Sequence, residues 1–251
     1  MFAVPAERYD RFMGRYSQQL GSQMIALAGV DPPARVVDVG CGPGALTTEL
    51  AALVGPASVK AADPSEPFVA AARLRNPGVD VQLAAAESLP FADGEFDAAF
   101  AQLVVHFMSD PVAGIAEMAR VTRSGGAVVA CVWDHVGGRS PLSTFWQAAR
   151  EVHASAPSEA TRPGTREGHL AAIFSEAGLG GIVETVFTAR VEHETFDDWW
   201  EPYMYGVGPL GDFVATLDGE GRDAVRKRAA ELLPEPPFVL EAHAWAVRGV
   251  A

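Results

Sequence analysis

Short apolar segments alternate with helical ones through the first half of this 251-residue chain. The apolar segments have the composition of buried strands and cover residues 34–39, 58–62, 79–83, 97–101 and 127–133. The helical segments between them cover residues 45–54, 66–75 and 111–121. Strands that alternate with helices of about ten residues build βαβ units, whose strands lie parallel. The alternation therefore predicts an α/β fold with a doubly wound, mostly parallel sheet.

The second half of the chain is organised differently. Its pattern predicts helices over residues 139–153 and 166–177 and strands over residues 181–191 and 238–247. The segment 195–234, between the two strands, is rich in aromatic residues and then helical. An insertion of about 40 residues is too long for a plain loop, and long insertions often serve as lids or binding elements. We therefore expect helical cap insertions on the sheet.

The chain is strongly acidic. It has 19 Lys and Arg residues and 32 Asp and Glu residues, which gives a formal net charge of −13. Nucleic-acid affinity depends largely on Lys and Arg that neutralise phosphates. We therefore expect no nucleic-acid partner. No apolar run of about 18 residues is free of charges and helix breakers, which predicts no membrane span. The N-terminal residues also lack the apolar core of a signal peptide, which predicts a cytoplasmic protein.

The sequence offers no metal-binding pattern. Its two cysteines, Cys41 and Cys131, are isolated from one another and lie within or at the end of apolar segments. A cytoplasmic protein keeps such thiols reduced. No spacing of His, Cys, Asp or Glu resembles a zinc or calcium site. We expect two buried, unreactive thiols and no metal.

A glycine-rich turn between the first strand and the first helix carries the clearest chemical signal. Gly40, Gly42 and Gly44 follow one another at every second position. Glycines at such a turn allow positive φ angles and let a ligand approach the backbone, and the helix that follows presents free N–H groups. With Ala45, the spacing also fits the relaxed dinucleotide fingerprint. A nicotinamide-dependent oxidoreductase is therefore one hypothesis.

Further features favour another family. Asp38 lies inside the strand before the glycines, and Asp63 ends the next strand, 19 residues after Gly44. The segments 86–91 and 95–97 then follow the third strand. This set resembles the class I S-adenosylmethionine-dependent methyltransferases, in the branch with the ubiquinone/menaquinone-type enzymes. The resemblance covers residues 34–133 closely. It implies a seven-stranded, mostly parallel sheet with an antiparallel last strand, and methyl transfer to a small organic acceptor.

The resemblance implies a site for the cofactor, S-adenosylmethionine. Its residues would be Arg15, Tyr16, Asp38, Gly40, Cys41, Gly42, Gly44, Asp63, Pro64, Ser65, Phe68, Ala86, Glu87, Ser88, Gln102 and Leu103. In such a site the glycines line the methionine part, Asp63 accepts the ribose hydroxyls and the Ala86 N–H meets the adenine. The family often has an acid where this chain has Ala85, so that contact is missing or Glu87 or Ser88 replaces it.

Two histidines are candidate general bases. His106 follows the fourth strand and His135 follows the fifth, near the carboxyl ends where α/β sheets bind ligands. Methyl transfer needs a base only when the nucleophile must lose a proton. Alternatively, each histidine has only a packing role.

The predicted organisation is one structural domain with three parts. Residues 1–30 form an N-terminal helical lid, residues 31–134 a cofactor-binding core, and residues 135–251 the rest of the sheet with a substrate cap at 135–165 and 195–234. The aromatic residues of this cap favour a small apolar or aromatic acceptor. We expect a monomer or a homodimer. A non-methylating S-adenosylmethionine-binding protein of the same fold stays an alternative, and hydroxyl, amine and carbon acceptors stay open.

Overall fold

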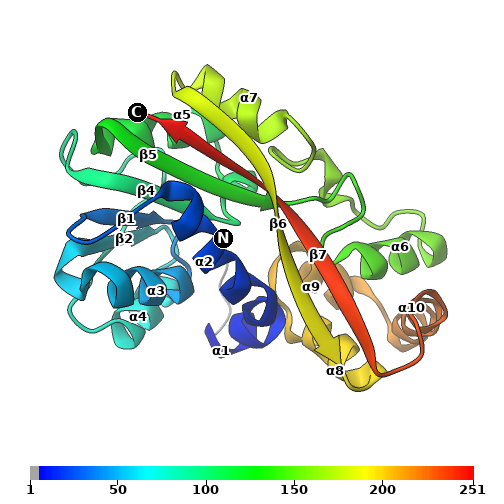
Figure 1. Cartoon of the computed structure of the whole chain (residues 1–251). Helices are drawn as coiled ribbons and strands as arrows, with labels where there is room; N and C mark the ends of the chain where they lie inside the picture. The colour runs from blue at the N-terminus through cyan, green and yellow to red at the C-terminus, as the bar shows by residue number, and fades with distance from the viewer. Residues whose placement is uncertain (1–5) are drawn as a thin grey trace.

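A seven-stranded sheet forms the centre of the molecule in the computed structural model, which describes residues 6–251 (Figure 1). The strands are β1 (Val36–Val39), β2 (Val59–Asp63), β3 (Asp80–Leu83), β4 (Phe96–Gln102), β5 (Thr122–Trp133), β6 (Gly180–His193) and β7 (Phe238–Val250). Their order is β3-β2-β1-β4-β5-β7-β6. Only β7 runs antiparallel to its neighbours, β5 and β6. The predicted fold class is confirmed.

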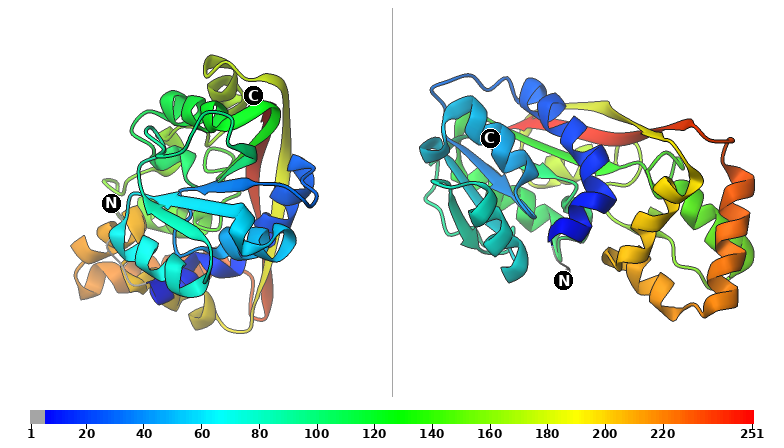
Figure 2. Two further views of the ribbon diagram at one scale, coloured as in Figure 1. Left: turned by 90° about the vertical axis from the view of Figure 1, so that its left-hand side faces the viewer. Right: turned by 90° about the horizontal axis from the view of Figure 1, so that it is seen from below.

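Helices cover both faces of this sheet (Figure 2). The α-helices are α1 (Ala6–Tyr9), α2 (Arg15–Ala28), α3 (Ala45–Val54), α4 (Glu66–Arg75), α5 (Pro111–Val121), α6 (Ser143–Val152), α7 (His169–Glu176), α8 (Phe196–Trp200), α9 (Gly208–Thr216) and α10 (Gly219–Leu232). Shorter turns are η1 (Asp10–Gly14), η2 (Pro56–Ser58), η3 (Val105–Phe107), η4 (Glu159–Thr161) and η5 (Glu201–Tyr205). None of the helices in the described part of the chain is long and apolar enough to cross a membrane.

Alternation along β1 divides the apolar core into two layers. Val36 packs in the layer under α2, α3 and α4, whereas Val37 and Val39 pack in the layer under α5 and α7. Successive strand residues point to opposite faces, so a strand covered on both sides is apolar throughout. Asp38 is the exception in this strand, and it is fully buried. A buried carboxylate inside such a strand needs a local reason, which the site provides.

The predicted helices 45–54, 66–75 and 111–121 match α3, α4 and α5. The strand expected over 127–133 begins earlier, at Thr122, because the glycine-rich segment before it is part of β5. Phe96 pairs with Thr122 and Ala98 with Ala127, so the residues between them bulge out. The backbone N–H of Gly125 donates to the carbonyl of Ala251 at 2.8 Å, which fixes this bulge to the end of the chain.

The β6–β7 pair extends beyond the sheet as a two-stranded ribbon. β5 and β7 stop pairing at Trp133 and Ala244, whereas β6 and β7 stay paired out to His193 and Phe238. Figure 1 shows α8, α9 and α10 at the far end of this ribbon, beside α6. α10 packs directly on α6. The segments 135–165 and 195–234 therefore come together in space although β6 separates them in sequence.

Helix α2 covers the outer edge of β6 with polar side chains. Gln19 accepts from the Arg190 N–H and donates to its carbonyl, and Gln23 does the same at Thr188. Arg15 donates to the Glu192 carbonyl one step further along. Four residues of a helix and two of a strand both advance about 6 Å, so the two spacings match. This ladder satisfies edge groups that would otherwise be free to pair with another chain.

Replacing both glutamines with alanine removes this cover. In the double variant Gln19→Ala/Gln23→Ala we expect faster amide hydrogen exchange at Thr188 and Arg190, and a loss of about 1–3 kcal/mol in the free energy of unfolding. Gln18→Ala is the matched control, because Gln18 is an exposed residue of the same helix. Unchanged exchange at both amides in the double variant would show that the ladder does not protect the edge.

Candidate functional site

The glycine-rich loop after β1 is shaped by close neighbours on two sides. Gly40, Gly42 and Gly44 all have positive φ angles, of 70°, 53° and 89°. A Cβ atom at Gly40 would lie 2.4 Å from the Val104 side chain, and one at Gly44 would lie 2.5 Å from Asn76. At Gly42 such an atom would meet nothing within 4 Å. The loop is therefore pressed against the protein at its ends and open at its middle, where a ligand can approach the backbone.

Asp63 links this loop to the turn after β2. One carboxylate oxygen accepts the Gly42 N–H at 2.9 Å and the other accepts the Ser65 N–H at 2.8 Å. Asp63 is buried, and this burial raises the pKa of its carboxyl. Each carboxylate oxygen has a second lone pair, so Asp63 can still accept hydroxyl groups of a ligand.

Asp38 lies under the loop with half of its carboxylate unsatisfied. One oxygen accepts from the Thr47 hydroxyl of α3 at 2.6 Å, whereas Oδ1 has no hydrogen-bond partner among the described residues. Burial is the main cause that raises the pKa of Asp38, to about 7, and the nearby Asp63 carboxylate adds to it. A buried acceptor without a partner is costly unless a ligand satisfies it. The ammonium group of the expected cofactor fits this acceptor.

Residues around the loop complete the predicted cofactor side. Phe68 is buried against the Tyr9 ring, with 5.5 Å between the ring centroids, and Pro64 is exposed. Cys41 is buried, which raises the pKa of its thiol well above its usual value, as an inert thiol requires. In the described part of the chain, no three His, Cys, Asp or Glu side chains gather as a metal site would need.

The residues expected on the adenine side lie in different surroundings. Ala86 is buried, but Glu87 accepts the backbone N–H groups of Ser109 and Asp110, at the start of α5. Glu87 is therefore engaged by another loop, whereas Ser88 is exposed. Glu87 and Ser88 are the two residues that could replace the family's acid at position 85. Of these two, Ser88 is the one whose side chain accepts no such backbone hydrogen bonds.

The end of β4 is held in a strained turn. Leu103 has a φ of 59°, the only positive value among the non-glycine residues that the structure describes. Its N–H donates to the Cys131 carbonyl at 2.9 Å. Gln102, just before it, donates to the Ser17 carbonyl and so ties β4 to α2. Such strain often marks functional sites.

Arg15 and Tyr16 make their contacts with the cap. The Arg15 guanidinium lies 3.0 Å from both Asp198 oxygens, and the Tyr16 hydroxyl lies 3.0 Å from Nε2 of His193. Asp198 belongs to α8 and His193 ends β6. The structure therefore brings these two residues to the cap, and their contact with the cofactor stays a prediction.

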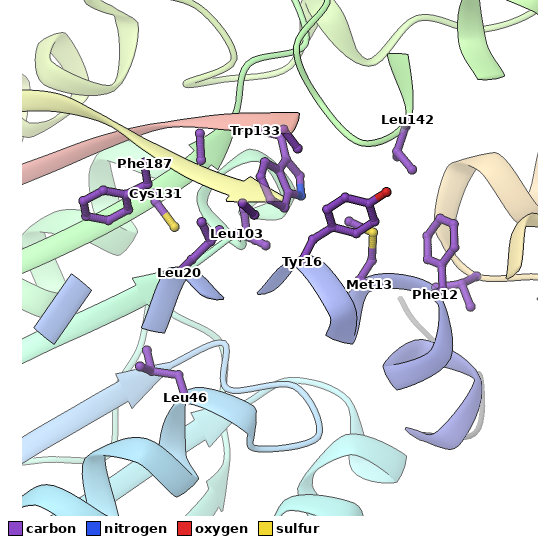
Figure 3. Close-up of a cluster of buried hydrophobic side chains, with 14 of the residues drawn as sticks. Phe12, Met13, Tyr16, Leu20, Leu46, Leu103, Cys131, Trp133, Leu142 and Phe187 are labelled. Atoms are coloured by element: carbon purple, nitrogen blue, oxygen red, sulfur yellow. The ribbon is translucent and has the colours of Figure 1, made fainter. Parts of the chain in front are cut away.

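A cavity opens beside the ends of β4 and β5. Its walls include Leu103, His106, Trp133, His135 and Glu159, with apolar residues of the N-terminal segment and of the start of α9. Figure 3 shows Leu103 and Trp133 gathered with Met13 and Leu142 in this region. The two predicted histidines thus reach the same cavity.

The environment of the two histidines keeps them neutral. Their ring centroids lie 5.9 Å apart, and Nδ1 of His106 has no hydrogen-bond partner among the described residues. Burial drives the pKa of His106 well below its usual value, and burial lowers that of His135 to about 4, with a further contribution from Arg162 in both cases. A neutral imidazole has one free nitrogen lone pair and can accept a proton.

Comparison with known proteins identifies the family. A model described as a methyltransferase domain matches residues 37–130. An uncharacterised protein of Mycobacterium tuberculosis is 31% identical over 215 residues, which cover 79% of this chain and 77% of that one. A demethylmenaquinone methyltransferase of Mycobacterium sp. (strain KMS) is 39% identical over 139 residues, or 52% of this chain and 57% of that one.

A solved structure of a SAM-dependent methyltransferase from Thermotoga maritima has the same fold. It superposes with a TM-score of 0.58 at 21% identity, over 97% of this chain and 95% of that one. The chain belongs to the class I S-adenosylmethionine-dependent methyltransferases. The enzyme class predicted from the glycine loop and Asp63 is confirmed, and nothing favours the nicotinamide alternative.

Sequence patterns missed several residues of this methyltransferase site. Val104 and Asn76 shape the glycine loop, and Thr47 holds Asp38, but none of the three belongs to a family motif in the sequence. Glu159 lies in a segment that reads as a polar linker, yet it is buried and accepts the indole N–H of Trp146 at 2.8 Å. No local signal distinguishes a buried glutamate in such a segment from an exposed one.

The raised pKa of Asp38 predicts a pH-dependent stability. Between the ordinary pKa of 3.8 and the folded-state value of about 7, the folded protein keeps a proton that the unfolded chain has released. The free energy of unfolding therefore falls as the pH rises through this range. Asp38→Asn removes this effect, so its stability relative to the wild type should rise from pH 4 to pH 7, by at most about 1.4 kcal/mol per pH unit.

Urea denaturation at several pH values measures this difference. The exposed Asp31 provides the control variant Asp31→Asn, which should keep a constant offset from the wild type. A constant offset for Asp38→Asn as well would contradict the assignment of the raised pKa to this residue.

Proposed function

We propose that this methyltransferase methylates a small, largely apolar or aromatic acceptor that binds in the cavity beside β4 and β5. The observation that carries the proposal is His106, a buried histidine of the cavity wall whose Nδ1 has no partner. Val104 directly follows Leu103 of this wall in the sequence, and its side chain packs on Gly40. The cavity and the glycine loop are thus adjacent parts of one site.

On the cofactor side, the glycine loop, Asp38 and Asp63 would hold S-adenosylmethionine. When bound, this cofactor supplies a methyl group on an already activated sulfonium. The unsatisfied oxygen of Asp38 would accept from its ammonium group, and the Asp63 carboxylate would accept from its ribose hydroxyls. Asp63 is already fixed by two backbone N–H groups, so it needs no rearrangement to do so.

On the acceptor side, apolar walls exclude water and align the acceptor. The neutral imidazole of His106 would take the proton that a hydroxyl, amine or activated carbon loses when it is methylated. His135 lines the same cavity and is the second candidate for this role. Because a neutral imidazole is needed, the low pKa of both rings keeps the base form present at neutral pH.

The parts of the chain would divide the work as the sequence suggests. Residues 31–134 would hold the cofactor, and segments 135–165 and 195–234 would cover the acceptor. Residues 1–30 would act as a lid, although residues 1–5 lie outside the described part of the chain. In support, the cavity is lined by Phe12 and Met13 from one side and by Val207 and Leu210 from the other.

Removing the Asp63 carboxylate should weaken cofactor binding. We expect Asp63→Ala to lower the affinity for S-adenosylhomocysteine by about 1–3 kcal/mol in isothermal titration calorimetry. Asp63→Asn keeps the side-chain shape and tests the same point if alanine disturbs the loop. Glu66→Ala, which removes an exposed acid three residues away, is the matched control. Saturable binding of NAD or NADP without any response to S-adenosylhomocysteine would overturn the proposal.

Replacing His106 should slow methyl transfer without weakening cofactor binding. With an acceptor from a panel of apolar phenols, amines and enols, we expect His106→Asn to lower kcat about 10²–10⁴-fold, as loss of a general base does. His135→Asn serves as the comparison and should lower kcat less. Equal turnover in both variants and the wild type would remove imidazole bases from the mechanism. Cofactor binding without turnover of any acceptor would instead favour a non-methylating protein of this fold.

A further inference from the structure

A second, smaller cavity lies between the N-terminal segment and the cap. Phe12, Met13 and Leu142 line both this cavity and the acceptor cavity, so the two adjoin. Figure 3 shows the hydroxyl end of Tyr16 directed toward the side of Phe12 and Leu142. The proposed methyl transfer leaves this space without a role.

The second cavity is lined by positive charge, whereas the molecule as a whole is negatively charged. Its walls contain two arginines, Arg11 and Arg15, and no acidic residue, in a chain with a net charge of −13. Arg15 is paired with Asp198. Arg11 is exposed and forms no ion pair with any acid whose side chain the structure describes. Among the described side chains, no acid therefore compensates this guanidinium at the cavity.

Two buried donors on the same walls are also unsatisfied. The indole N–H of Trp199 has no partner among the described residues, although only 2% of Trp199 is exposed. His193 is 3% exposed, and its Nδ1 lies 3.3 Å from Asp198 without hydrogen-bond geometry. If the Tyr16 hydroxyl donates to Nε2, Nδ1 carries the proton of the neutral ring. Buried N–H groups without acceptors are costly, and an oxyanion satisfies them.

We propose that the second cavity binds the carboxylate of the methyl acceptor, while the apolar body of the acceptor occupies the adjoining cavity. The proposal rests on the proposed function in taking this ligand to be the acceptor. Guanidinium and N–H donors together suit a carboxylate. Phe12, Phe107 and Trp133 on the walls of the adjoining cavity suit an aromatic body. The methyl acceptor would then be a small aromatic or apolar carboxylic acid.

The carboxylate of the cofactor is the other source of the same chemistry. The glycine loop that would receive the methionine part contributes no residue to the second cavity. We therefore assign the cavity to the acceptor, and the experiment separates the two sources.

Calorimetry with benzoate and its neutral analogue benzamide tests the proposal. We expect the wild-type protein to bind benzoate at least tenfold more tightly than benzamide, with an affinity that falls as salt rises. Arg11→Gln should weaken benzoate binding about five- to tenfold and leave benzamide binding unchanged. Trp199→Phe, which keeps an aromatic ring without the N–H, should also weaken benzoate selectively. Arg166→Gln removes an exposed arginine outside both cavities and should change neither.

Three results would overturn the proposal. The first is equal binding of benzoate and benzamide, or no binding of benzoate. The second is an equal loss of benzoate affinity in Arg11→Gln and Arg166→Gln. The third is a loss of S-adenosylhomocysteine affinity in Arg11→Gln with benzoate binding intact, which would assign the cavity to the cofactor. Failure of the wild type to bind S-adenosylhomocysteine would instead contradict the proposed function.

Discussion

The carboxylate of Asp63 fixes the part of the molecule on which the proposed methyltransferase site depends. It accepts one backbone N–H from the loop after β1 and one from the turn after β2, so it sets the distance between two strand ends. Hydrogen bonds from neutral N–H groups to a carboxylate are stronger than those between neutral groups. They offset part of the cost of burying Asp63. The loop is further held by contact of Gly40 with Val104, which only a glycine allows at this position.

The acceptor side depends on a different feature, the length of the β6–β7 ribbon. Because this ribbon continues past the end of β5, it places α8, α9 and α10 beyond the sheet, where α10 packs on α6. The N-terminal segment closes the remaining side, and Arg15 and Tyr16 bind it to the cap. Both cavities are therefore built by segments from distant parts of the chain.

The sheet core could be predicted from sequence because its signals are local. Helices α3, α4 and α5 begin and end next to Gly or Pro or where an apolar segment ends. The alternation of strands and helices then predicts the parallel arrangement. The glycine spacing and Asp63 identified the enzyme family for the same reason. The early start of β5 was missed, since its pairing depends on the end of the chain at Ala251.

The cap could not be predicted in the same way. Tyr16 and His193 are 177 residues apart, and Arg15 and Asp198 are 183 apart, so no local pattern relates them. Their contact depends on where the long ribbon ends. Arg15 was expected in the cofactor site from the resemblance alone, and its contacts in the structure are with α8 and β6. Periodicity likewise gave no sign that Glu159 is buried beside Trp146.

A crystal structure of the protein with S-adenosylhomocysteine would test the central claim most directly. The account predicts the ribose hydroxyls at the Asp63 carboxylate, the amino group at the free oxygen of Asp38, and the sulfur facing the cavity that His106 lines. A cofactor whose sulfur points away from that cavity, or whose ribose leaves Asp63 bonded to Gly42 and Ser65 alone, would contradict it.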